Sequence, residues 1–172
     1  MSSKTPFVRQ VAWISLIPQL LFIAILTMLY KTFIRSLYDA LNAAMITYVF
    51  AAIFLRYLIP RNHRKGIRFF KSNKYVQAIS EFEKSYDFFT KHAWIDKYRF
   101  IVLLSSSRIS YTEMALINTA FCYTQIGNGS KAKMYYKKAL KQFPNSGMAK
   151  SALQMLNSAT DSVSEETGTR CD

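Results

Sequence analysis

Few residues of the 172-residue chain have the types and spacing that site chemistry requires. His63 and His92 have no cysteine or carboxylate at metal-ligand spacing, so we expect no bound metal. The chain has none of the short patterns typical of thiol redox, metalloprotease, serine hydrolase or phosphate-loop sites. Glu81, Glu83 and Asp87 lie among lysines on a predicted helix, where surface ion pairs explain them better than acid–base catalysis. We therefore expect neither an enzyme nor a cofactor.

The cysteines and the most basic helix also have structural explanations. Cys122 falls within an apolar helical pattern, which is typical of a small buried residue. Two cysteines, Cys122 and Cys171, are too few for a disulfide framework, and they lie too far apart to indicate a redox compartment. The lysine-rich stretch over 131–141 could bind nucleic acid. Its apolar neighbours, however, predict that one side of this helix is buried, so the lysines are explained as its solvent-exposed side. We do not expect nucleic acid as a partner.

The elements that must position any site differ sharply along the chain. Of the net charge of +13, residues 1–60 carry 5 basic and 1 acidic side chains, and 61–100 carry 10 and 4. Residues 101–150 carry 7 basic and 1 acidic side chains, whereas residues 151–172 carry 1 basic and 4 acidic side chains. The mean hydropathy of +0.03 therefore averages an apolar first third with a basic middle and an acidic end.

Two apolar runs in the first third predict membrane spans. Residues 11–30 contain no charge, and a helix of that length is about 30 Å long, close to the thickness of the bilayer hydrocarbon. Residues 40–59 contain one charge, Arg56, near the end, where its guanidinium can reach the headgroups. A secretory signal peptide or two buried helices of a soluble bundle are the alternatives. The run of 11–30 is long for a signal peptide, and both runs are apolar on all sides.

The basic residues after the second run set the expected orientation. Four of them form a predicted membrane-surface group that either contacts anionic lipid or only fixes topology: Arg61, Arg64, Lys65 and Arg68. The positive-inside rule places them in the cytoplasm, and two spans place residues 1–10 there too. We expect an integral membrane protein whose helical domain faces the cytoplasm.

From residue 61 the pattern becomes that of paired amphipathic helices. Two windows share the same internal spacing, with Gly66, Ala78 and Phe82 in the first matched by Ala120, Ala132 and Tyr136 in the second. Turn-forming residues separate the helices at 71–74 and 127–129.

These windows, about 59–92 and 113–146, resemble the tetratricopeptide repeat (TPR), a helix–turn–helix unit of about 34 residues. The resemblance implies that small residues face each other across each pair, here Gly66 with Ala78 and Ala120 with Ala132. It also implies a protein partner bound in a groove lined by the first helix of each repeat. Carried over by position, that groove comprises His63, Ile67, Phe70, Lys71, Met114, Ile117, Phe121, Thr124 and Gln125.

The spacing between the windows departs from the family, because Gly66 and Ala120 are 54 residues apart. We interpret residues 88–110 as an insert that fills the end of a helix pair; its aromatic and basic residues could instead form an interfacial or partner-binding surface. Residues 147–156 predict a capping helix, and 157–172 a disordered acidic tail.

The predicted fold class is therefore all-α: a two-helix transmembrane hairpin at 11–60, then a short TPR-like α-solenoid at 61–156 with an insert between two repeats. The expected function is a non-enzymatic, membrane-anchored module that docks a protein partner. The alternative is an accessory subunit of a larger membrane complex, held through its hairpin, with Asn42, Thr47 and nearby alanines facing another membrane helix.

Overall fold

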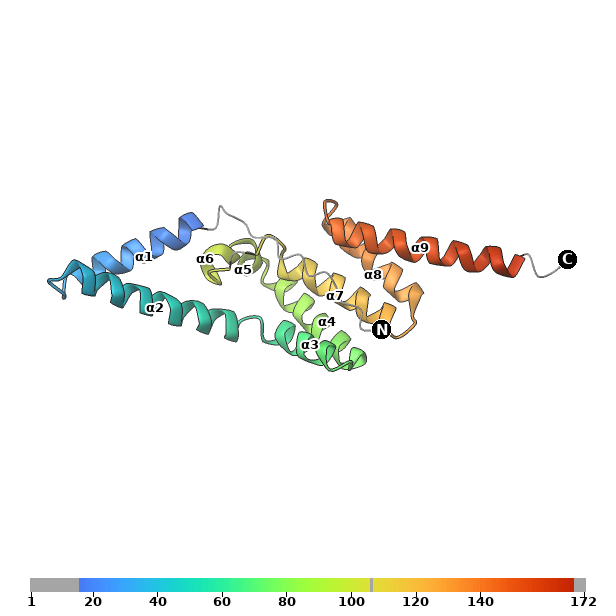
Figure 1. Ribbon diagram of the computed structural model, residues 1–172, viewed down its shortest axis with the longest axis horizontal. Coiled ribbons are helices and arrows are strands. Elements are labelled where there is room, and N and C mark those ends of the chain that lie inside the picture. The colour runs from blue at the N-terminus through green and yellow to red at the C-terminus, as the bar shows by residue number, and fades with distance from the viewer. Residues whose placement is uncertain (1–15, 106, 169–172) are drawn as a thin grey trace. The chain divides into compact units, whose positions relative to one another are not determined.

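The computed structural model describes residues 16–105 and 107–168, and this part of the chain is all-helical, with nine helices and no strand (Figure 1). The all-α prediction is therefore confirmed. Contacts divide the chain into two units, of which the first is Met1–Arg61 with His92–Ser110 and the second is Asn62–Lys91 with Tyr111–Asp172. The predicted tail over 1–10 lies outside the described residues.

The first unit contains α1 (Leu16–Lys31) and α2 (Leu37–Leu58). Ser36 caps α2 by accepting a hydrogen bond from the backbone N–H of Asp39, 3.4 Å away. Among the described residues, α2 is the single helix long and apolar enough to cross a membrane, and α1 is a shorter apolar helix. Only 11% of the most apolar window of α2 is buried, so most of its apolar surface faces outward.

Helices α1 and α2 pack against each other. The hydroxyls of Tyr30 and Thr47 share a hydrogen bond of 2.8 Å, and the rings of Phe22 and Tyr48 lie 6.4 Å apart. The buried residues of α2 are alanines, which allow a close approach of the two backbones: Ala40, Ala44 and Ala52. Thr47 therefore contacts α1 rather than being left for another helix, as the alternative function assumed.

The segment between the two TPR-like windows forms two short helices, α5 (Ala93–Lys97) and α6 (Arg99–Val102). Residues 92–110 of this segment have their contacts mainly with α1 and α2. The Gln19 side chain donates to the backbone carbonyl of Leu104 at 3.2 Å, and Arg56 donates to the carbonyls of Leu103 and Leu104. Arg56 is thus half-buried, and its guanidinium contacts the backbone of this segment.

The second unit contains two helix–turn–helix pairs and a final helix. The first pair is α3 (Arg61–Lys71) and α4 (Tyr75–Lys91), and the second is α7 (Tyr111–Gln125) and α8 (Gly129–Gln142). Helix α7 packs on both α4 and α8, and α8 packs on α9 (Gly147–Gly168). Asn128 caps α8 by accepting from the backbone N–H of Lys131 at 3.1 Å.

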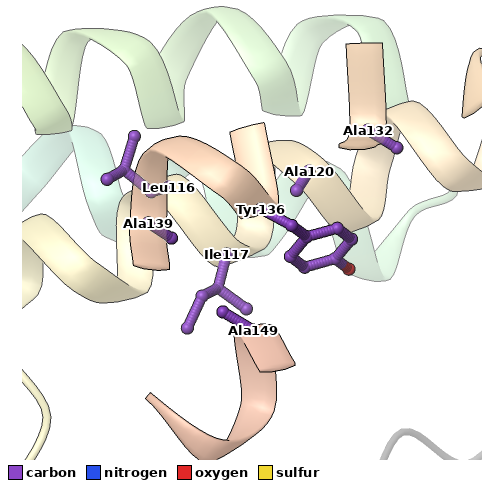
Figure 2. Close-up of a cluster of buried hydrophobic side chains, with 7 residues drawn as sticks. All are labelled: Leu116, Ile117, Ala120, Ala132, Tyr136, Ala139 and Ala149. Carbon is purple, nitrogen blue, oxygen red and sulfur yellow. The ribbon is translucent and has the colours of Figure 1, made fainter. Parts of the chain in front are cut away.

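Small residues let α7, α8 and α9 approach closely around one hydrophobic cluster (Figure 2). Ala120 and Ala132 are both fully buried in it, together with larger side chains such as Leu116 and Tyr136. A second cluster joins α4 to α7 through Ala78, Ile79, Phe82 and Cys122. Full burial of one leucine-sized side chain contributes about 1.5–3 kcal/mol, so these clusters are the main source of stability in this unit.

The end of the chain differs from the sequence prediction. A helix was expected over 147–156 and disorder over 157–172, but α9 continues through residues 157–168. These residues include few strong helix breakers, and a helix already initiated adds residues at little cost. Residues 169–172 lie outside the described part.

Candidate interaction surface

Two of the predicted groove residues belong to the core. His63 is only 3% exposed and lies between the rings of Phe82 and Tyr111, each 5.4 Å away. Ile117 is buried in the same cluster as Ala149 of α9, which covers this part of α7. The helix that follows the second window and the aromatic packing of the first therefore remove both residues from any groove.

The structure brings α3 and α7 together through another predicted pair. The rings of Phe70 and Phe121 lie 5.5 Å apart, and Phe70 also meets Tyr75 at 5.7 Å, edge to face. Both phenylalanines are half-buried, so they join the two helices while leaving part of each ring at the surface. The first helices of the two windows are therefore in contact through these two rings.

The other predicted groove residues have varied surroundings. Met114 and Thr124 are half-buried on α7, and the Thr124 hydroxyl donates to the backbone carbonyl of Ala120 at 3.2 Å. Lys71 and Gln125 are exposed. The polar ends of the expected groove are thus accessible, whereas its centre is filled by packed side chains.

One face of α3 carries a shallow depression of about 270 Å³ lined by Arg64, Ile67, Arg68 and Lys71. Their spacing of three and four residues places all four on the same side of the helix. The depression combines two sets that were predicted separately, since Ile67 and Lys71 belong to the groove and Arg64 and Arg68 to the membrane-surface group. We call these four residues the α3 depression.

Three cations around one apolar side chain make the α3 depression complementary to an anionic, partly apolar ligand. Arginine and lysine are charged at neutral pH, and guanidinium groups form paired hydrogen bonds with carboxylate or phosphate. Helix α3 itself contains no acidic residue. Ile67 packs against the Ala78–Phe82 cluster, so the floor of the depression is fixed by the core. The exposed Arg61 and Lys65 do not line it.

A network of tyrosines and lysines joins α4, α7 and α8 and was missed from the sequence. The Tyr135 hydroxyl donates to the Glu83 carboxylate at 2.6 Å, and the Tyr135 ring stacks on Tyr123 at 5.4 Å. The Lys138 ammonium lies 4.2 Å from the centre of the Tyr86 ring. The available signal was the two adjacent tyrosines among four lysines over 131–138. Lys138 therefore has an aromatic partner within the fold, which supports the interpretation of this helix as structural.

The same network shifts the pKa values of its tyrosines. Burial and the hydrogen bond to Glu83 raise the pKa of Tyr135. At Tyr86 burial raises the pKa, but the hydrogen bond that Gln142 donates at 2.7 Å and the nearby Lys138 charge outweigh it, so the pKa of Tyr86 is lowered. The pKa values shift in opposite directions because burial and the Glu83 hydrogen bond favour the neutral Tyr135, whereas the Gln142 hydrogen bond and the Lys138 charge favour the ionised Tyr86.

Cys122 is fully buried, as its sequence environment indicated, and burial raises the pKa of its thiol to about 12. Within the described residues no group of three or more His, Cys, Asp or Glu side chains is arranged to hold a metal ion.

The chain matches no protein-family model, no curated protein and no solved structure. Its function must be argued from its own residues.

Proposed function

We propose that the protein is a non-enzymatic, membrane-anchored interaction module. In this proposal α1 and α2 form a transmembrane hairpin, and the helix pairs α3–α4 and α7–α8 form a TPR-like domain that docks a partner protein at the cytoplasmic face of the membrane. Anchoring raises the effective concentration of the partner at the membrane without any chemistry.

The observation that carries the proposal is the outward-facing apolar surface of α2. Large apolar side chains cover it over most of its length, among them Phe50, which is 70% exposed, and Ile53 and Phe54. Removing apolar surface from water is favourable by roughly 25 cal/mol per Å², so a helix of this kind is stable in lipid and costly in water. The packed, alanine-lined contact with α1 gives the two helices a common surface for lipid.

The cytoplasmic orientation is proposed from charge. Arg61, Arg64, Lys65 and Arg68 follow α2 directly, whereas the link between α1 and α2 has only Lys31 and Arg35 around it. Anionic lipid headgroups are a further proposed contact for Arg61 and Lys65, which are exposed and lie outside the α3 depression.

The proposed docking site is the α3 depression with the adjoining Phe70–Phe121 contact. Its chemistry favours an acidic partner segment that also presents an apolar side chain, which is bound through paired carboxylate contacts and apolar burial.

Charge reversal at the depression tests the docking proposal. The full-length chain in native membranes is crosslinked and its partners identified, with Arg68→Glu and Lys71→Glu compared with Lys150→Glu, an exposed lysine on α9. The depression variants are expected to lose a partner that Lys150→Glu retains. Equal recovery by all three variants would refute the depression as the docking site.

The alternative function is an accessory subunit of a larger membrane complex, held by α1 and α2. Asn42, exposed on an otherwise apolar helix, favours it, because an amide in lipid gains from a hydrogen bond to a neighbouring helix. Replacing the first 60 residues with an unrelated membrane anchor separates the two proposals. The docking module keeps its partner after the exchange, and the accessory subunit loses it.

A further inference from the structure

We propose that residues 93–105 and 107–108, within the first unit, form a membrane-interface element: a short helical segment that lies in the headgroup region and is held on α1 and α2 by Arg56. This inference rests on the proposed membrane anchoring and adds a second lipid contact to it.

The segment is amphipathic. Trp94, Tyr98 and Ile101 follow a spacing of four and three residues, and they are 57%, 50% and 60% exposed. Ile95 is buried on the opposite side, and Leu103 and Leu104 follow it into the interior of the unit. A tryptophan and a tyrosine beside an aliphatic side chain form a surface suited to the boundary between water and hydrocarbon, where such amphipathic rings are enriched.

The charge of the segment agrees with an anionic surface. Within residues 93–108 there are three lysines and arginines and one aspartate. The Lys97 ammonium lies 5.4 Å from the centre of the exposed Tyr98 ring, so the cation and the aromatic surface occupy the same edge. Basic residues attract anionic headgroups while the apolar face enters the lipid, which is the composition of helices that lie in a membrane surface.

The irregular backbone after α6 is hydrogen-bonded by side chains. Arg99 donates to the carbonyls of Asp96 at 2.9 Å, Ser107 at 3.0 Å and Arg108 at 2.6 Å. Arg56 donates to the carbonyls of Leu103 and Leu104, and Gln19 adds a bond to Leu104. Irregular backbone tolerates a lipid environment only where its polar groups are satisfied within the protein, and two guanidinium groups provide this here.

These bonds also fix the place of the segment. Arg56 is near the end of α2 and Gln19 near the start of α1, so one stretch of backbone is bonded to both apolar helices at the same end of the pair. In Figure 1 α5 and α6 lie beside that end of α1. If α1 and α2 cross the bilayer, a segment attached there lies at its surface. The lipid interface is therefore the occupant we assign to the Trp94–Tyr98–Ile101 face.

Quenching of Trp94 by brominated lipid tests the proposal. The chain has two tryptophans, so Trp13→Phe leaves Trp94 as the single emitter in the full-length protein. The protein is reconstituted in phosphatidylcholine–phosphatidylserine vesicles brominated either near the headgroup end or near the tip of the acyl chains. We expect Trp94 emission to fall most with bromine near the headgroup end. An unquenched Trp94, or one quenched mainly from the chain tips, would overturn the proposal.

Two comparisons complete the experiment. The first comparison uses Met155→Trp, at an exposed position on α9, in a chain that also carries Trp13→Phe and Trp94→Phe. We expect its emission to stay unquenched. Quenching equal to that of Trp94 would overturn the assignment of the lipid contact to this segment. Arg56→Leu removes the guanidinium without adding charge to α2 and is expected to abolish Trp94 quenching, whereas unchanged quenching would refute Arg56 as the holding residue.

Extraction with alkaline carbonate separates the two proposals. If the protein stays in the vesicles but Trp94 is unquenched, the interface element fails and the anchor survives. If carbonate removes the protein, the proposed anchor fails, and the interface element with it.

Discussion

The close contact between Gly66 of α3 and Phe82 of α4 gives a sharp test of the packing. A Cβ added at Gly66 of α3 would come 2.7 Å from Cδ1 and Cε1 of Phe82 on α4, whereas one added at Gly129 of α8 would have no atom within 4 Å. Carbon atoms prefer separations of about 3.5–4.0 Å, so Gly66→Ala forces a shift that Gly129→Ala does not. Phe82 is almost fully buried, and its ring cannot turn aside into solvent.

The expected magnitude combines two opposing effects. An extra methyl group in a packed core costs about 1–3 kcal/mol. Alanine in a helix interior is better than glycine by about 1 kcal/mol. Gly66→Ala should therefore lower the free energy of unfolding by roughly 1 kcal/mol, while Gly129→Ala leaves it unchanged or slightly raised. When Phe82→Leu removes the ring, Gly66→Ala should become stabilising, a coupling of about 1–2 kcal/mol between the two sites.

Thermal unfolding of the full-length chain in detergent micelles, followed by circular dichroism, measures these differences. For a chain of this size, 1 kcal/mol corresponds to a change in melting temperature of about 2–4 °C. The reasoning is refuted if Gly66→Ala shifts the melting temperature by the same amount with Phe82 as with leucine at that position. It is also refuted if Gly66→Ala behaves like Gly129→Ala.

Three further outcomes follow from single contacts. Burial raises the folded-state pKa of the Cys122 thiol from about 9 to about 12, so the neutral thiol stabilises the fold fully below pH 9 and this contribution is lost as the pH rises. In denaturant unfolding, the free energy of unfolding should fall by roughly 1 kcal/mol between pH 9 and 10. Cys122→Ala should abolish this fall. Tyr135→Phe removes the hydrogen bond to the half-buried Glu83 carboxylate and should cost about 1–2 kcal/mol in the same assay, with no loss contradicting the contact. Asn128→Ala removes the cap on the Lys131 N–H and should cost about 1 kcal/mol, whereas Asn128→Ser should cost less.

Much of the helical organisation was predictable because it depends on local patterns. Apolar residues at helical spacing and turn residues at 71–74 and 127–129 located both helix–turn–helix pairs of the second unit. The fully buried Ala120 and Ala132 also agree with their assignment as small residues of a close contact. Gly66 lies at a close contact between helices, as predicted, but the residue nearest to it is Phe82 and not Ala78. The residues that face each other across a helix pair depend on how each helix is rotated about its axis, which the spacing of residues does not specify.

The candidate surface was only partly predictable, because exposure depends on elements far away in the sequence. Nothing local to Ile117 shows that α9 will cover it, and nothing local to His63 shows that Phe82 and Tyr111 will enclose it. The basic face of α3 could be located, since the spacing of Arg64 and Arg68 within one helix is a local property. Its combination with Ile67 and Lys71 required the structure.

The 54-residue separation between Gly66 and Ala120 now has a structural explanation. Residues 92–110, which belong to the first unit, account for 19 of these residues. The chain leaves the second unit between α4 and α7, and this stretch makes backbone contacts with Arg56 and Gln19. An insertion that only lengthened a loop would not need arginines to satisfy its carbonyls. Two guanidinium groups, Arg56 from α2 and Arg99 from the segment itself, thus bond the backbone of this stretch.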